Sequence, residues 1–173
     1  MDGRRLGSLV GATGGLAFVL LNAGDLPGAW LHRVLGVVLA VAVVACVVLL
    51  PAEPPPPVDR RGIRLYGASV TLMVLAILVG ARVLDASGHA SWMRAWVVLV
   101  VGLHFLPFAR AFAQPLFTWL GAILAALGVL GLALAPTVDA APAAVAVGAG
   151  YALLVAALLG PVGPALRRRD AVR

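Results

Sequence analysis

Six long stretches without a charged residue follow one another along the chain, separated by short segments rich in proline, glycine or charge. The uncharged stretches cover residues 6–24, 34–50, 65–81, 95–109, 111–138 and 140–166. A helix of about 20 apolar residues crosses the roughly 30 Å hydrocarbon core of a bilayer. The pattern therefore predicts an all-α, polytopic membrane protein with six transmembrane helices in a single domain, residues 1–173.

Interfacial aromatic residues and helix breakers adjust the bounds of these stretches. The expected helices run over residues of about 6–24, 29–50, 63–84, 91–109, 115–135 and 141–166. The connections expected outside the cell are short, and we therefore predict three antiparallel hairpins.

The first stretch follows two arginines and resembles a secretory signal, but residues 21–23 make a poor cleavage site. We interpret it as an uncleaved first helix.

Composition supports a membrane protein of bacterial type. Hydrophobic residues make up 62% of the chain, charged residues 12%, and the mean hydropathy is +1.06. These values lie far from those of a soluble domain. All 13 basic residues are arginine, and the chain is rich in Ala, Val, Leu, Gly and Pro. This bias indicates a GC-rich genome and hence a bacterial plasma membrane.

The arginines fall mainly on one side of the expected helices. With the N-terminus in the cytoplasm, three lie outside, and the inner ones are Arg4, Arg5, Arg60, Arg61, Arg64, Arg110, Arg167, Arg168, Arg169 and Arg173. Such an asymmetry is the positive-inside signal, and it predicts that both termini are cytoplasmic. The net charge of +6 then reflects topology rather than nucleic-acid binding. It suits contact with anionic lipids of the inner leaflet.

His104 is the clearest candidate for a functional residue. We expect it about 20 Å from the outer surface, where a polar ring is costly unless it faces the bundle or water. Pro107 removes a backbone donor and frees the carbonyl of Leu103. Other polar side chains expected at a similar depth complete a candidate solute site, namely Tyr66, Ser69, Thr13, Thr118 and Trp119. The alternative is a neutral histidine that holds two helices together by one hydrogen bond.

Charged residues near the outer ends of the helices form a second candidate site. An outer vestibule that attracts anions would consist of Arg33, Arg82, Arg94, Asp25 and Asp85, with His89 nearby. We expect Arg33 to pair with Asp25, and Arg82 with Asp85. The alternative is ordinary interfacial anchoring, in which the long side chains reach back to water.

The outer segments share a weak repeat, because Asp25 precedes Trp30 as Asp85 precedes Trp92. Asp139 occupies the third outer segment without a tryptophan. Either the chain contains three related hairpins, or each segment independently needs a carboxylate that caps the next helix.

Gly7, Gly11 and Gly15 recur at four-residue spacing and predict a helix face that another backbone can approach closely. The spacing leaves open whether the partner is a helix of the same chain, a second protomer or another membrane protein. Residues 51–59 contain four consecutive prolines, which favour a stiff, extended spacer or a docking segment.

The sequence lacks the residues that several kinds of chemistry require. No Asp or Glu lies near the middle of an expected helix, which disfavours proton- or sodium-coupled carriers. We find no His/Cys/carboxylate cluster with metal-ligand spacing, no phosphate-binding loop and no nucleophile motif. We therefore predict no metal, no cofactor and no enzymatic activity.

The segment Gly-Leu-His-Phe-Leu-Pro-Phe-Ala at residues 102–109 resembles a run found in uncharacterised bacterial membrane proteins of this size and helix count. The resemblance implies that the pairing of His104 with Pro107 recurs, and it implies no activity. Two functions remain open. The chain binds or passes a small neutral or weakly polar solute, which predicts a cavity between the first, third, fourth and fifth helices. Alternatively, it is an accessory or scaffold protein, which predicts a packed interior and an open glycine face on the first helix.

Overall fold

The computed structural model describes residues 3–50, 60–112 and 114–171, with side chains for residues 5–50, 60–112 and 114–162. This part of the chain contains no strand, and its elements are α1 (Gly3–Asn22), η1 (Ala23–Asp25), α2 (Ala29–Leu49), α3 (Arg60–Ala86), η2 (Ala90–Trp92), α4 (Met93–Phe112), α5 (Pro115–Leu134) and α6 (Ala141–Ala171). Six helices are long and apolar enough to cross a membrane. The prediction of an all-α, six-span membrane protein is therefore confirmed. The proline-rich linker at 51–59 lies outside the described residues.

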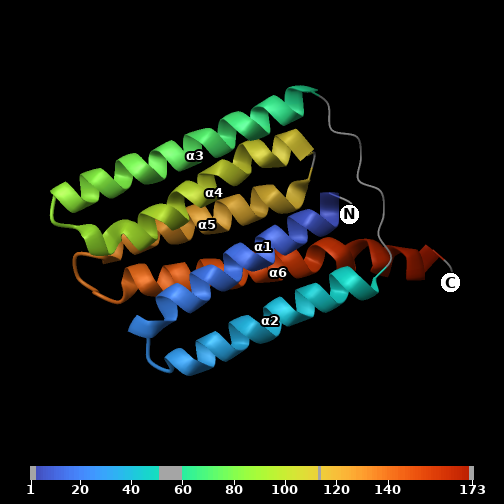
Figure 1. Ribbon diagram of the computed structural model, residues 1–173, viewed down its shortest axis with the longest axis horizontal. Helices are drawn as coiled ribbons and strands as arrows, with labels where there is room; N and C mark the ends of the chain where they lie inside the picture. The colour runs from blue at the N-terminus through green and yellow to red at the C-terminus, as the bar shows by residue number, and fades with distance from the viewer. Residues whose placement is uncertain (1–2, 51–59, 113, 172–173) are drawn as a thin grey trace.

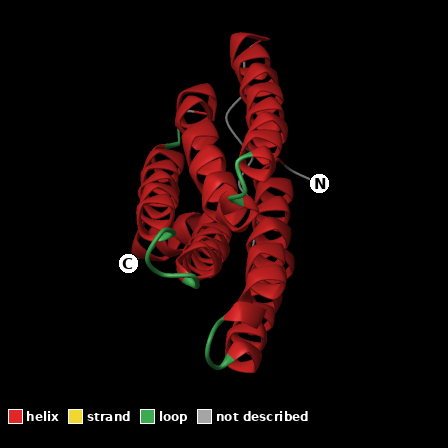
Figure 2. Ribbon diagram, turned by 90° about the vertical axis from the view of Figure 1, so that its left-hand side faces the viewer, coloured by secondary structure: helices red, strands yellow, loops and turns green. Residues whose placement is uncertain are grey.

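The six helices run side by side along the long axis of the molecule, and both chain ends lie at the same end (Figure 1). We call this the terminal end; the α4–α5 connection also lies there. The opposite end, the loop end, carries the α1–α2, α3–α4 and α5–α6 connections. In the view along the bundle, α3, α1 and α2 form one layer, and α4 is set back behind it (Figure 2).

The core lies around α6, which packs against α1, α2, α4 and α5. One buried cluster joins α1, α2 and α6 and includes Val19, Val43 and Leu154. The other joins α4, α5 and α6 and includes Val98 and Leu124. By contrast, α3 lies at the edge of the bundle and packs mainly against α4. The interior is thus filled by small and branched apolar side chains from five helices.

Glycines form the closest helix crossings. A Cβ atom on Gly15 of α1 would lie 2.7 Å from the carbonyl oxygen of Gly150 on α6. On α4, a Cβ atom on Gly102 would overlap the backbone nitrogen of Ala125 on α5. Gly11 also faces α6. The glycine face expected on the first helix therefore packs against another helix of the same chain. Gly7 does not share this role, since nothing lies within 4 Å of its Cβ position.

The three predicted hairpins do not stand out as units. Consecutive helices such as α1 and α2 do pack together, but the most intimate contacts join α4 with α5 and α1 with α6. The division into hairpins therefore stays a prediction.

Two of the three loop-end segments share one backbone feature. Gly28 and Gly88 each lie three residues after an aspartate and adopt positive φ angles of 69° and 76°, a conformation that favours glycine. The expected capping by Asp25 and Asp85 is wrong. Gly28 is the N-cap of α2 and makes no side-chain bond, and Asp85 lies inside α3. For Asp139 the capping role stays a prediction.

Candidate functional site

Two side-chain hydrogen bonds fasten α3 to α4. The indole Nε1 of Trp96 donates to the carbonyl oxygen of Ala76 at 3.0 Å, and its ring lies against Gly80, where a Cβ atom would overlap it. Further toward the terminal end, the hydroxyl of buried Ser69 donates to the carbonyl oxygen of His104 at 3.0 Å. Because α3 has few other buried residues, these two bonds and the aromatic contacts below fix its position.

The His104 ring has one nitrogen satisfied and one without a described partner. Nδ1 lies 2.8 Å from the carbonyl oxygen of Val101, one turn earlier on α4. A carbonyl oxygen can only accept, so Nδ1 must carry the proton, and the neutral ring leaves Nε2 as an acceptor. Among the described residues, no hydrogen bond reaches Nε2. His104 is half-buried, about 17 Å along α4 from its first residue.

This geometry predicts an unusual tautomer for His104. Nitrogen-15 spectra of the histidine-labelled protein in nanodiscs are expected to contain the signal of a ring protonated at Nδ1 and bare at Nε2 that disappears in His104→Phe, separately from the signal of His32, whose Nδ1 also faces an oxygen. His89, which is exposed, provides the reference for a ring in exchange with water. A ring protonated only at Nε2 would contradict the bond to Val101.

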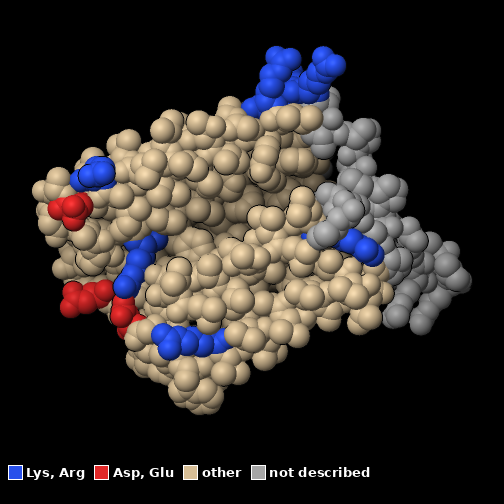
Figure 3. Space-filling model, in the orientation of Figure 1, with Lys and Arg blue, Asp and Glu red and all other residues tan. Residues whose placement is uncertain are grey.

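A recess separates α1 from α3 on one face of the molecule. Figure 3 shows the surface hollowed between these two helices, and Figures 1 and 2 place α4 behind the gap. On α4, Trp96 faces α3 and Val98 belongs to the core around α6. At 100° per residue, His104 lies about 80° from Trp96 and about 120° from Val98, on the longer of the two arcs between them, so it points neither directly at α3 nor directly at the core. The half-buried residues on the same side of α4 as His104 are Val97, Val101 and Phe108, and we call these four residues the His104 strip.

Aromatic rings surround the terminal end of this strip. Phe108 contacts the His104 ring at a centroid distance of 5.5 Å and the Tyr66 ring of α3 at 4.9 Å. Phe105 lies 4.5 Å from the His104 ring on its other side and stacks on Phe117 of α5 at 5.8 Å. The histidine thus lies in an apolar, aromatic setting, with Nε2 as its unused polar atom.

The structure brings together only half of the predicted solute site. Ser69 bonds to His104 where α3 crosses α4, and Tyr66 contacts Phe108, whose ring packs on that of His104. The predicted cavity shared with Thr13 and Trp119 is wrong, because Thr13 is exposed and bonded to its own helix at Leu9, and Trp119 is 71% exposed. The position of each residue along its helix gives its depth but not the direction in which the helix faces.

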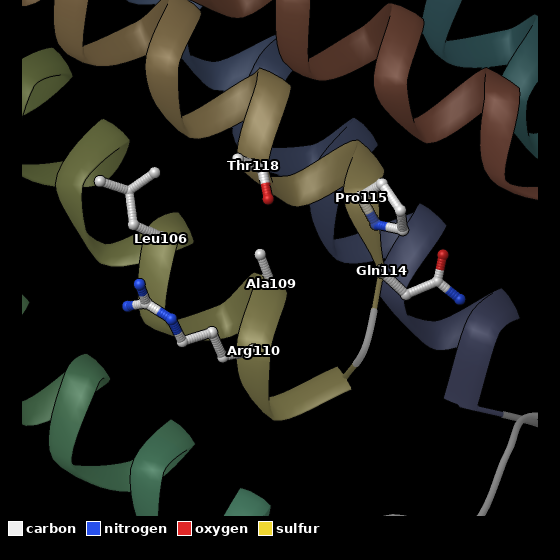
Figure 4. Close-up of a pocket in the computed structure, with 6 residues that line it drawn as sticks. All are labelled: Leu106, Ala109, Arg110, Gln114, Pro115 and Thr118. Atoms are coloured by element: carbon white, nitrogen blue, oxygen red, sulfur yellow. The ribbon is translucent and has the colours of Figure 1, made fainter.

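Thr118 lies instead in a separate hollow at the terminal end. This hollow has a volume of about 380 Å³ and is lined by Leu106, Ala109, Arg110, Gln114, Pro115 and Thr118. Figure 4 shows that its two long polar side chains diverge, with the amide of Gln114 and the guanidinium of Arg110 pointing in opposite directions. The hollow does not gather polar groups around one point.

At the loop end, Asp25 pairs with Arg94 across the ends of α1 and α4. The expected pairing of Asp25 with Arg33 is therefore wrong, and within the described residues no ion pair joins Arg82 to Asp85. His89 packs on Trp92 at a centroid distance of 4.3 Å. A role of this end as an anion vestibule stays a prediction.

One polar pair was missed by the sequence reasoning. Nδ1 of His32 on α2 lies 3.0 Å from the hydroxyl of Tyr151 on α6, and that hydroxyl also donates to the backbone oxygen of His32 at 3.2 Å. The pair joins α2 to the centre of the bundle. The signal available in the sequence was the tyrosine in the middle of an otherwise apolar stretch.

The part of the chain that the structure describes holds no group of three or more His, Cys, Asp or Glu residues arranged to bind a metal ion. Comparisons with protein-family models, with curated proteins and with solved structures find no match for this chain. By the length and composition of its helices it is a multi-pass membrane protein. The resemblance at residues 102–109 stays a prediction.

Proposed function

We propose that this protein binds a small, largely apolar solute in the recess between α1 and α3. The observation that supports the proposal is the His104 ring, whose Nδ1 is bonded to Val101 while Nε2 has no partner among the described residues. An unsatisfied polar atom within the membrane costs free energy. A solute that donates one hydrogen bond to Nε2 would remove that cost.

The surroundings of Nε2 define the solute. The strip formed by Val97, Val101 and Phe108 is apolar and half-buried, so most of the solute must be apolar as well. Because Nε2 is an acceptor, the solute needs a hydroxyl or N–H group. This describes a neutral or weakly polar molecule that dissolves in the bilayer and enters the recess sideways from the lipid.

Binding fits the packing better than passage through the bundle does. The described core around α6 is closed by buried residues such as Val98, Leu124 and Leu154, and the recess lies on the surface of the bundle. The charge asymmetry supports a cytoplasmic position of the terminal end, and the composition, with arginine as its sole basic residue besides histidine, supports a bacterial plasma membrane.

Native mass spectrometry of the protein released from nanodiscs tests this function. The protein is purified with lipids from the expressing cells, and wild type is compared with His104→Phe, which keeps an aromatic ring but removes the acceptor. Wild type is expected to carry a discrete extra mass that is not a phospholipid. Loss of one hydrogen bond should weaken retention about tenfold in His104→Phe.

His89→Phe is the matched control, because His89 is exposed at the loop end and precedes the start of α4. It should retain the extra mass at the wild-type level. The proposal fails if wild type carries only phospholipid, or if His104→Phe retains the mass as well as the control does.

One observation favours the second candidate, an accessory protein that packs against a membrane partner. Only Gly62, Ser69 and Gly80 of the 27 residues of α3 are buried, and most of the others are exposed. A protein mass retained in place of a small solute would support this alternative.

A further inference from the structure

The start of α3 carries an exposed cluster of positive charge. Arg60, Arg61 and Arg64 lie within its first five residues and are all exposed. Figure 3 shows arginine side chains projecting from the terminal end of the molecule. Within the described side chains, none of the three forms an ion pair.

The position of the cluster in its helix is electrostatically unfavourable without an anion. The N-terminal end of a helix has a partial positive charge, which attracts carboxylates and repels arginine. The first turn of α3 nevertheless has no acidic residue. Asp59 precedes it in the sequence but lies outside the described residues. The described carboxylates Asp25, Asp85 and Asp139 all belong to the opposite, loop end.

The length of α3 places these arginines at the level of lipid headgroups. Its 27 residues span about 40 Å, which exceeds the roughly 30 Å hydrocarbon core of a bilayer. Its uncharged stretch, residues 65–81, would lie in the hydrocarbon. Arg60 and Arg64 then lie in the headgroup layer on one side and Arg82 on the other.

The cluster also faces away from the protein. Ser69 marks the side of α3 that contacts α4, and at 100° per residue Arg64 and Arg60 lie about 140° and 180° away from it. These guanidinium groups therefore face the surrounding lipid. Arginine binds phosphate oxygens through paired N–H donors.

We propose that Arg60 and Arg64 form a binding site for the phosphate of an anionic phospholipid in the leaflet at the terminal end. The lipid's phosphodiester lies between the two guanidinium groups and its acyl chains run along the outer face of α3. The small residue Gly67, with no atom within 4 Å of its Cβ position, leaves room for a chain beside the helix. The site does not involve His104 and is independent of solute binding in the recess.

The test is a lipid titration of the full-length protein in detergent micelles, read by native mass spectrometry. Apparent dissociation constants are measured for phosphatidylglycerol and for phosphatidylcholine. Wild type is expected to prefer phosphatidylglycerol. In the Arg60→Gln/Arg64→Gln variant, the ratio of the dissociation constants for the two lipids should fall about fivefold for each arginine removed.

Arg168→Gln/Arg169→Gln is the matched control, because it removes the same charge from two arginines of α6, outside the proposed site. It should retain the preference. An equal loss in both variants would overturn the proposal by showing an effect of overall charge alone. A wild-type protein that binds both lipids equally well would overturn the proposal too. Complete displacement of the lipid by millimolar inorganic phosphate would also overturn it, because it would indicate a site for soluble anions.

Discussion

Gly102→Ala is expected to lower the free energy of unfolding by about 3 kcal/mol, at the upper end of the usual cost of overpacking. The added methyl group would overlap the backbone nitrogen of Ala125 and lie 2.8 Å from the carbonyl carbon of Leu124. Backbone atoms cannot rotate out of the way as a side chain can. The helices α4 and α5 must therefore separate, and their contacts around Leu124 are lost over several turns.

The measurement is an SDS titration in mixed micelles, followed by circular dichroism. Gly67→Ala is the control, because it makes the same exchange on an exposed part of α3 with no atom within 4 Å. Alanine has the higher helix propensity by up to about 1 kcal/mol, so the control should unfold at the same SDS concentration as wild type or at a higher one. Equal stability of the two variants would show that α4 and α5 do not cross this closely.

The sequence predicts the number and extent of the helices because their signal is local. Hydropathy over some 20 residues identifies each span, and the expected fourth and fifth helices, residues 91–109 and 115–135, lie close to the observed α4 and α5. The neighbours of each helix depend on long-range packing that hydropathy does not encode. In the sequence Gly102 is a glycine in an apolar run, and only the three-dimensional structure shows that it meets Ala125.

The same distinction explains the outcome for the candidate site. Depth along a helix is a local property, and Ser69 and Tyr66 of α3 do lie beside His104 and Phe108 of α4. Rotation of a helix about its axis is fixed by its partners, and the sequence alone did not show that Trp119 faces outward. Ion pairs across loops are equally nonlocal, so the sequence favoured the near neighbour Arg33 over Arg94 as the partner of Asp25.

Adjacent glycines of α1 provide a matched pair for the second prediction. A Cβ atom on Gly15 would lie 2.7 Å from the oxygen of Gly150 and 2.9 Å from Cγ of Leu154, whereas nothing lies within 4 Å of that position on Gly14. Gly15→Ala and Gly14→Ala make the same change in intrinsic helix propensity. Their difference therefore measures the contact between α1 and α6, and we expect Gly15→Ala to be less stable by about 2 kcal/mol.

Gly150→Ala completes a double-mutant cycle, because its added Cβ atom would lie 2.7 Å from the carbonyl oxygen of Gly15. Either substitution alone must separate α1 from α6, so the second substitution breaks fewer contacts. The double variant should therefore lose less free energy of unfolding than the two single variants lose together. Additive losses, or equal stability of Gly14→Ala and Gly15→Ala in the same SDS titration, would contradict this crossing. If the glycines joined two protomers instead, Gly15→Ala would lower the mass of the complex in detergent, whereas a contact within the chain leaves that mass unchanged.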